Sequence, residues 1–176
     1  MSSEIDLDGR IGEGWSGVKP NGSHVNVVLG RRGTPTAAAL LGTLTTPSPG
    51  HTPILVVVGP TEEDYEPVWP PTIMINKATA VEDLHQTITW GAAQLGIAQG
   101  VLDAVADGLL PPTDEVVVFV AAWVDPRASE ETAVRQANRA AVRKAIGVAV
   151  AGRDPEAASA LVARRDTLRS PFYGGE

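Results

Sequence analysis

The sequence predicts an α+β fold, in which a mixed or mainly antiparallel sheet has helices packed on one face. Strand-like and helical segments follow one another in the order ββαββαβα, and the helices are segregated instead of alternating strictly with the strands. The 176 residues also fit one compact domain. At this length a core can bury roughly 70% of the unfolded chain's surface without metal or disulfide support. We divide the chain into a polar N-terminal extension (1–10), a domain (11–152) and a C-terminal tail (153–176).

A strand bounded by glycines is expected at residues 22–30, shortly after the regular pattern begins at Ile11. Valine and leucine at the odd positions alternate with His24 and Asn26 at the even ones. Successive side chains of a strand point to opposite faces, so the histidine and the asparagine share a face.

A short helix rich in alanine and leucine is expected at residues 36–45. Thr34 can cap its N-terminus, and Pro35 suits its first position. A Pro-Ser-Pro-Gly stretch ends this helix, and a continuous apolar run then covers residues 54–58. An unbroken apolar run of this length is typical of a central strand that is buried on both faces.

The remaining elements complete the predicted order. The proline-rich, acidic segment 59–71 is expected to be a loop, and a strand is expected at residues 72–79. A long helix at 81–110 precedes a buried strand at 115–124 and a last long helix at 129–152. Apolar residues at alternating spacings of three and four give the helix 81–110 one apolar stripe, formed by Leu84, Ile88, Gly91, Leu95, Ala98, Leu102, Val105 and Leu109.

The last long helix has boundary signals at both ends. Acidic residues after Ser129 loosely match a capping box, and Gly152 is a typical residue at a helix C-terminus. Between them, Gln136, Arg139 and Arg143 form a polar face. The tail beyond Gly152 is expected to carry one short helix.

Charge and composition exclude several classes of protein. With 21 acidic and 14 basic residues, the formal net charge is -7, and no basic run offers a site for nucleic acid. The absence of cysteine excludes thiol catalysis, disulfides and cysteine-ligated metals. The acidic N-terminus lacks the apolar core of a signal peptide, and no apolar run approaches the ~18 residues of a membrane span. We expect a cytoplasmic protein that binds neither nucleic acid nor membranes.

His24 is the first candidate for chemistry. It lies in mid-strand beside Asn26, which makes the centre of that face polar, and this is unusual for a sheet face that packs against helices. An imidazole can serve as an acid or a base at neutral pH. The alternative is an ordinary histidine on a solvent-facing side of the sheet.

Lys77 and Thr79 form the second candidate. Ile73 and Ile75 set the apolar face of their strand, and Lys77 continues that face where another apolar residue would be expected. A lysine whose stem is buried can bind an anionic group, or a carbonyl as a Schiff base. The alternative is a lysine that extends from the sheet edge into solvent.

Gln94, His51 and His85 are weaker candidates. Gln94 lies beside the apolar stripe of the long helix and could offer its amide to a ligand. His51 precedes a Thr-Pro turn, and His85 is expected at the surface in the first turn of a helix. The 3 histidines share no ligand spacing, so we expect no metal site.

Short motifs spread along most of the chain carry further information. They are Ile11-Gly12-Glu13, His24-Val25-Asn26, Gly30-x-Arg32-Gly33-x-Pro35, Gly50-His51-Thr52-Pro53-Ile54-Leu55, Asn76-Lys77-Ala78-Thr79, Trp90-Gly91-Ala92-Ala93-Gln94, the spaced residues Asn138, Ala141, Arg143, Ile146, Ala149 and Gly152, and Pro171-Phe172. In this order, from about Ile11 to Tyr173, they resemble the formaldehyde-activating enzyme family. The combination of N-K-x-T, aromatic-G-x-A-Q and the upstream histidine is the specific part.

The resemblance implies a fold, an assembly and an activity. The fold would be similar to the second domain of ribosomal protein S5, in a homopentamer with sites between subunits, and the tail would pack on a neighbouring subunit. The activity would be condensation of formaldehyde with tetrahydromethanopterin or a related reduced pterin, as co-substrate, to give the methylene-bridged pterin and water without a metal. Carried over by position, His24 would be the general acid, and the substrate-binding residues would be Asn26, Leu55, Lys77, Thr79 and Gln94.

Three positions depart from the family's pattern. The family's aspartate is Asn26 here, and Asp125 stands where the family has a histidine after its last strand. The loop 59–71 is longer and more acidic. These changes suggest a different amine acceptor, or a slower or lost reaction. The alternative function is therefore a non-catalytic homologue that binds a pterin or an aldehyde adduct as a carrier or sensor, and a structural oligomer without a ligand is a third.

Overall fold

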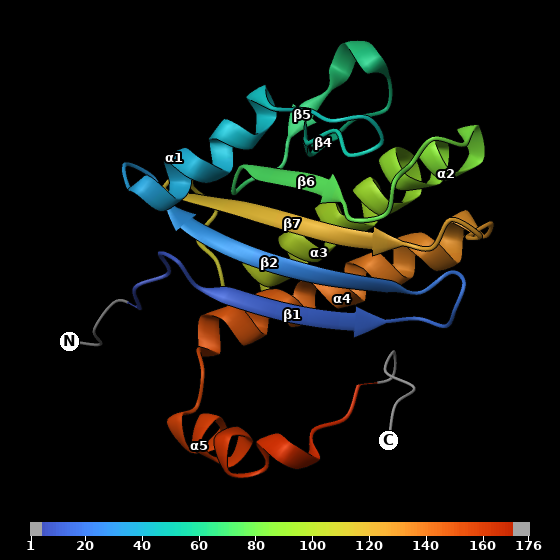
Figure 1. Cartoon of the computed structure of the whole chain (residues 1–176). Coiled ribbons are helices and arrows are strands. Elements are labelled where there is room, and N and C mark those ends of the chain that lie inside the picture. The colour runs from blue at the N-terminus through green and yellow to red at the C-terminus, as the bar shows by residue number, and fades with distance from the viewer. Residues whose placement is uncertain (1–4, 171–176) are drawn as a thin grey trace.

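A computed structural model describes residues 5–170, which form a mixed five-stranded sheet with helices on both faces (Figure 1). The strands, in their order across the sheet, are β1 (Ile11–Ser16), β2 (Ser23–Arg31), β7 (Val116–Val124), β6 (Thr72–Asn76) and β3 (Ile54–Leu55). Neighbouring strands are antiparallel, except that β6 and β7 run parallel. The predicted α+β class with a mixed sheet is confirmed.

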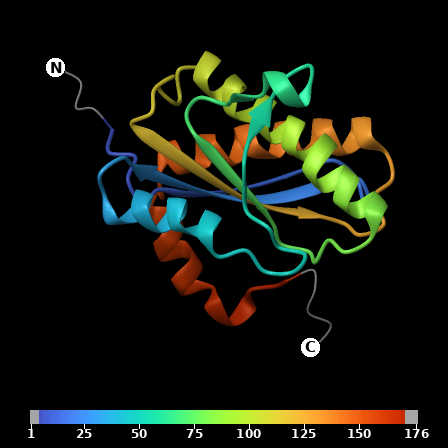
Figure 2. The same cartoon turned by 90° about the horizontal axis from the view of Figure 1, so that it is seen from above.

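Two long helices, α3 (Gln94–Ala106) and α4 (Glu131–Ala151), cover one face of the sheet. The main core lies between them and the sheet, where the odd-numbered apolar residues of β2 are fully buried. Figure 2 shows the sheet between these helices on one side and the short helix α1 (Pro35–Gly42), in cyan, on the other.

The position of α1 contradicts the expectation that all helices pack on one face. Ala37 of α1 forms a small buried cluster with Ile73 and Val117 on the second face of the sheet. Gly30 of β2 permits this contact, because a Cβ at this position would press against the backbone of α1. The helix itself is as expected at its start, where the side chain of Thr34 accepts a hydrogen bond from the backbone N–H of Ala37 at 3.2 Å.

The strand β1 lies directly on α4 because its inward positions are glycines. A Cβ at Gly12 or at Gly14 would overlap carbonyl oxygens of α4. The residues between and after these glycines, Glu13 and Trp15, are exposed. Successive side chains of a strand alternate between faces, so both lie on the side of the sheet opposite α4.

The apolar run 54–58 is not a central strand. Its first two residues form the edge strand β3, whereas β4 (Val57–Val58) pairs with β5 (Glu66–Pro67) in a separate two-stranded ribbon. Val56 is fully buried between the two pieces, and the flanking residues are partly buried. The run is thus apolar because it crosses the edge of the core, and the expected loop 59–71 contains the partner strand β5.

The expected helix 81–110 is divided into three parts. A short helix α2 (Asp83–Thr87) leads into a π-helical segment (Ile88–Ala93), which continues as α3. The wider π turn changes the helical register, so the predicted stripe is not one buried face: Leu84, Leu95 and Leu102 are exposed. The buried face of α3 is formed instead by Gly96, Ile97, Ala98, Gly100, Val101 and Ala104.

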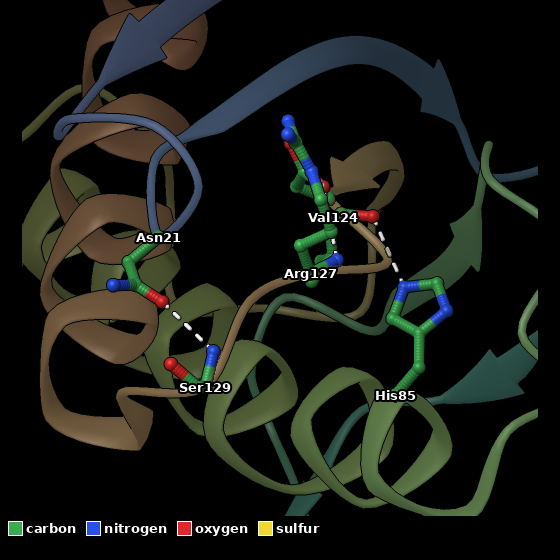
Figure 3. Close-up of polar contacts among 6 residues, drawn as sticks. Asn21, His85, Val124, Arg127 and Ser129 are labelled. Atoms are coloured by element: carbon green, nitrogen blue, oxygen red, sulfur yellow. Dashed lines mark hydrogen bonds and ion pairs between the residues drawn. The ribbon is translucent and has the colours of Figure 1, made fainter.

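The helix α4 ends as predicted but begins differently. Gly152, with φ 73°, follows its last residue. At its start the loose capping box does not form, because Glu130 is the N-cap and makes no side-chain cap. Instead Oδ1 of Asn21 accepts a hydrogen bond from the backbone N–H of Ser129 at 2.9 Å (Figure 3). It accepts a second one from the backbone N–H of Glu130 at 3.1 Å.

Ion pairs join α3 to the polar face of α4. Arg139 donates to both carboxylate oxygens of Asp103 at 2.6 and 2.8 Å, and Arg143 donates to Asp107 at 2.6 Å. The hydrogen bond from Arg139 lowers the pKa of the Asp103 carboxyl below its usual range. The predicted polar face of this helix is confirmed.

The chain continues beyond α4 in a short helix. In Figure 1 the helix α5 (Pro155–Ala163) lies below β1, and all residues from 153 to 170 are exposed. Leu161, Val162 and Leu168 are among the exposed large apolar residues. The motif Pro171-Phe172 lies outside the described residues. Within residues 5–170, no helix has the length and apolar character needed to cross a membrane.

Candidate functional site

The helix α1 covers only one end of its face of the sheet, and polar and aromatic side chains occupy the other end. The strand register aligns Trp15, His24 and Trp123 in one row across β1, β2 and β7. The next row contains Glu13 and Asn26 beside an alanine of β7. The small alanine side chain leaves space above the centre of the sheet.

Lys77 reaches this face from the end of β6. Its backbone N–H donates to the carbonyl oxygen of Ala122 in β7 at 2.7 Å, so the chain keeps its place beside the sheet for one residue beyond the strand. A hollow of about 780 Å³ lies here, lined by Glu13, Trp15, Lys19, His24, Lys77, Trp123 and Ser170.

Hydrogen bonds connect four of the side chains on this face. Nε2 of His24 lies 2.6 Å from Oε1 of Glu13, and Nδ1 of His24 lies 2.9 Å from Nζ of Lys77. Lys77 also donates to Oδ1 of Asn26 at 2.9 Å. A lysine ammonium has no acceptor, so with Lys77 charged Nδ1 accepts and the ring proton on Nε2 is donated to Glu13. His24 therefore joins a carboxylate to an amine.

The ammonium of Lys77 is in an unfavourable environment. Burial lowers the pKa of Lys77 below its usual range, and the negative charge of Glu13 opposes part of that effect. The oxygen that Asn26 offers is neutral. Within the described part of the chain, no carboxylate forms an ion pair with Lys77.

Aromatic rings form one side of the hollow. The rings of Trp15 and Trp123 lie 6.4 Å apart between centroids with an interplanar angle of 30°, and Trp15 lies 6.5 Å from the His24 ring. Trp15 is 40% exposed, so part of its ring is open to a ligand. A flat heterocycle could stack on such a surface.

The structure brings three of the six predicted site residues together. Hydrogen bonds through Lys77 connect His24, Asn26 and Lys77. Lys77 thus forms hydrogen bonds within this cluster. The alternative interpretation, in which its side chain extends from the sheet edge into solvent, does not hold. The other three, Leu55, Thr79 and Gln94, make no hydrogen bond to the cluster within residues 5–170.

These three residues have other partners. Oγ1 of Thr79 lies 3.0 Å from Nε2 of His51, whose Nδ1 lies 2.8 Å from the carbonyl oxygen of Asn76. Gln94 donates to the carbonyl oxygen of Val57 at 3.1 Å, on the side of the sheet that α3 covers. Leu55 pairs with β6 at the sheet edge. A single chain therefore joins only His24, Asn26 and Lys77, and the other three predicted residues lie at separate places.

The sequence analysis missed Glu13, Trp15 and Trp123 as site residues. The signal for the first two was the alternation of residues 11–15, in which Gly12 and Gly14 separate the larger side chains. Glycine carries no hydrophobic signal, so that strand looked weak. The third follows only from the register between β2 and β7.

Two residues near the end of β7 have structural partners (Figure 3). His85 is buried, and its Nε2 lies 3.0 Å from the carbonyl oxygen of Val124, so the expected surface position for this histidine is wrong. Asp125 is also buried and accepts hydrogen bonds from the backbone and guanidinium of Arg127 at 2.9 to 3.1 Å. The guanidinium of Arg127 lowers the pKa of Asp125 below its usual range.

Metal ligands do not converge in the described part of the chain. No group of three or more histidine, aspartate or glutamate side chains within residues 5–170 could hold a metal ion. The chemistry that this geometry offers is proton transfer and amine chemistry beside a flat aromatic surface.

The fold and the site together define an α+β protein with an acid–base cluster on an open sheet face. A family model described as formaldehyde-activating enzyme (Fae) matches residues 11–173. The chain is 34% identical over 168 residues to 5,6,7,8-tetrahydromethanopterin hydro-lyase of Methanosarcina barkeri, covering 94% of this chain and 91% of that protein. It therefore belongs to the formaldehyde-activating enzyme family.

Longer relatives show the same similarity. The chain is 32% identical over 171 residues to the bifunctional enzyme Fae/Hps of Archaeoglobus fulgidus, covering 96% of this chain and 42% of that protein. The corresponding enzyme of Methanothrix thermoacetophila is 31% identical over 144 residues, covering 81% of this chain and 36% of that protein. This chain thus spans less than half the length of these bifunctional relatives.

Proposed function

We propose that this chain is a hydro-lyase that condenses formaldehyde with a reduced pterin similar to tetrahydromethanopterin, giving the methylene adduct and water. The observation that carries the proposal is the hydrogen-bonded set Glu13, His24 and Lys77 in a hollow walled by tryptophan rings. The family and the M. barkeri relative support the same chemistry.

In the proposed reaction His24 is the general acid. One amine of the pterin adds to formaldehyde and forms a carbinolamine. Loss of hydroxide from this carbinolamine is the difficult step, and a positioned acid accelerates such a step typically about 10²- to 10⁴-fold. The imidazolium of His24 donates the proton, water leaves, and the second amine captures the resulting iminium. Glu13 stabilises the imidazolium through its bond to Nε2, and the proposal requires no metal ion.

The open aromatic surface is the proposed binding site for the pterin ring system. A pterin is flat and conjugated, so it gains stacking energy on Trp15 that a flexible amine would not gain. Asn26 and Lys77 lie beside this surface and offer hydrogen bonds to the polar edge of the ring. Holding both pterin amines near formaldehyde adds an orientation effect.

We propose further that neighbouring subunits complete the site in a homopentamer, with the S5-like fold that the family implies. This would bring Leu55, Thr79 and Gln94 of one subunit to the His24 cluster of the next. Two observations support an assembly: Leu95 and Leu102 are exposed along α3, and the tail exposes the apolar residues Leu161, Val162 and Leu168. The tail, residues 153–176, is then a segment that packs on a neighbour.

The test follows formaldehyde loss and methylene adduct formation with tetrahydromethanopterin, tetrahydrofolate and a simple diamine, each against its rate without protein. We expect protein-dependent acceleration with a reduced pterin. His24→Ala should lose most of that acceleration while its circular dichroism and thermal unfolding stay unchanged. If His24→Ala reacts as fast as the parent protein, His24 is not the acid.

The second candidate function is a non-catalytic protein that binds a pterin or an aldehyde adduct as a carrier or sensor. Asn26 favours it, because an amide cannot take a proton or balance a cation as the family's aspartate can. Under this alternative the parent protein binds a pterin without turnover, and Asn26→Asp gains turnover. Measurable condensation by the parent protein eliminates the alternative.

A further inference from the structure

The amine of Lys77 has the surroundings of a nucleophile. Nζ lies 2.9 Å from Nδ1 of His24 and 2.9 Å from Oδ1 of Asn26, and both partners are neutral when the ring carries one proton. Asn26 can accept a hydrogen bond from a neutral amine as well as from an ammonium, so its contact does not require the charged form. Burial of the lysine favours the neutral form as well.

The hydrogen-bonded chain provides a place for the displaced proton. A proton that moves from Nζ of Lys77 to Nδ1 of His24 gives an imidazolium, whose Nε2–H then points to the carboxylate of Glu13 at 2.6 Å. The negative charge of Glu13 stabilises that imidazolium. The same transfer therefore frees the lone pair of Lys77 and charges the proposed acid.

We propose that Lys77 captures formaldehyde covalently and passes it to the acceptor amine. This inference rests on the proposed use of formaldehyde as a substrate and adds a protein-bound intermediate to it. An amine desolvated among neutral partners is the usual way in which an enzyme activates a lysine toward a carbonyl carbon.

Each step of this capture balances. The lone pair on Nζ forms a bond to the carbonyl carbon, the π electrons move to oxygen, and the proton lost from nitrogen reaches that oxygen through His24, giving a carbinolamine. The His24 imidazolium then protonates the hydroxyl group, the C–O bond breaks, and water leaves. The nitrogen lone pair forms the C=N bond of a protonated imine. An acceptor amine adds to its CH₂ carbon, and the proton of that amine passes through His24 to Nζ. The bond between the CH₂ carbon and Nζ then breaks, which leaves Lys77 as the free amine and the acceptor as an iminium. The second amine of the acceptor captures this iminium and loses a proton.

Reductive trapping tests the proposal without any pterin. The protein is incubated at neutral pH with dilute formaldehyde and sodium cyanoborohydride, which reduces an imine to a methylamine. Peptide mass spectrometry then gives the methylation rate of each lysine in the same sample. The chain contains Lys19, Lys77 and Lys144, and the exposed Lys144 on α4 is the internal reference. We expect Lys77 to be methylated several-fold faster than Lys144.

A charge variant sharpens this test. Asn26→Asp would place a carboxylate where Oδ1 now lies 2.9 Å from Nζ of Lys77. The negative charge of that carboxylate would hold Lys77 as an ammonium. Methylation of Lys77 should slow severalfold in this variant, whereas methylation of Lys144 should not change. Methylation of Lys77 at or below the rate of Lys144 in the parent protein overturns the proposal.

Condensation assays separate this inference from the proposed function. If Lys77→Arg condenses formaldehyde with the pterin as fast as the parent protein does, Lys77 is not the carrier, although the proposed function stands. If Lys77 is methylated selectively but no acceptor reacts, the capture stands and the pterin condensation fails. Lys144→Arg is the matched control and should leave both the condensation and the labelling of Lys77 unchanged.

Discussion

Replacing Glu13 with glutamine tests whether the carboxylate assists His24 as an acid. The substitution keeps the shape of the side chain and removes its charge, so the contact between Oε1 and Nε2, now 2.6 Å, can persist as a neutral hydrogen bond. Glutamine stabilises an imidazolium less than a carboxylate does. The imidazolium of His24, which is the proposed acid, should therefore be less stable, and condensation should slow.

The size of the effect follows from exposure. The side chains of His24 and Glu13 are 32% and 68% exposed, so solvent screens the pair. Pairs of this kind contribute about 0.2–1 kcal/mol. Since 1.36 kcal/mol corresponds to a tenfold change in rate, condensation should slow by about 1.5- to 5-fold. A buried pair would have predicted a much larger loss.

The same substitution should have two opposing effects on Lys77. The charge of Glu13 raises the pKa of Lys77 against the effect of burial, so its removal lowers that pKa further and makes the neutral amine more abundant. The weakened His24 acid, in contrast, slows the loss of water from the carbinolamine on Lys77. Reductive methylation of Lys77 should therefore slow less than condensation does.

Initial rates of pterin condensation and the methylation of Lys77 should be measured on the same protein preparation. Glu62→Gln, which changes an exposed glutamate between β4 and β5, is the matched control and should change neither rate. An unchanged condensation rate in Glu13→Gln would refute the assisting role. A loss of more than about 100-fold would refute the screened-pair estimate and indicate that the carboxylate itself transfers a proton.

Three further predictions concern the fold and the assembly. Gly14→Ala should lower the free energy of unfolding in urea by about 1–3 kcal/mol, because its Cβ would overlap α4. The control Gly42→Ala should be neutral or stabilising, because its Cβ would meet nothing within 4 Å. Equal effects of the two substitutions would contradict the close contact at Gly14. Asp103→Asn should lower the free energy of unfolding by about 0.2–1 kcal/mol at neutral pH. Arg139 lowers the pKa of Asp103 in the folded state, so the stabilisation by this pair is fully present above the unfolded pKa of about 3.9. It is lost as the pH falls through the folded pKa. The free energies of unfolding of the parent protein and the variant should therefore become equal in acid. Removal of residues 153–176 should reduce the number of subunits per oligomer, measured by light scattering, while the domain keeps its circular dichroism; an unchanged number of subunits would argue against the tail as an intersubunit segment.

The strands expected at 22–30 and 115–124 could be predicted from the sequence to within one residue, whereas the strand expected at 72–79 ends at Asn76. The run 54–58 could not, because apolar character reports burial and not the identity of the pairing strand. Neither could the π-helical segment, since one wide turn leaves no trace in a spacing of three and four. The side of the sheet that α1 covers depends on the contact at Gly30, which requires the tertiary structure.

The site was predicted only in part for a similar reason. His24 stood out because, with Asn26, it makes the centre of a strand face polar, and Lys77 because it continues an apolar face. Their contact depends on the parallel pairing of β6 with β7, and no local pattern encodes that pairing. Leu55 came from the family resemblance alone, whereas Thr79 and Gln94 were also candidates from the pattern. The separation of all three from His24 in one chain is visible only in the structure.

The eight-residue length of α1 has an evolutionary consequence. The helix covers one half of its sheet face and leaves the other half to Glu13, His24 and Lys77, whose side chains point away from the main core. Substitutions among these outward residues can change the chemistry while the residues that determine folding stay the same. Asn26 lies on the same outward face. A scaffold divided in this way separates the residues of the proposed chemistry from those that form the main core.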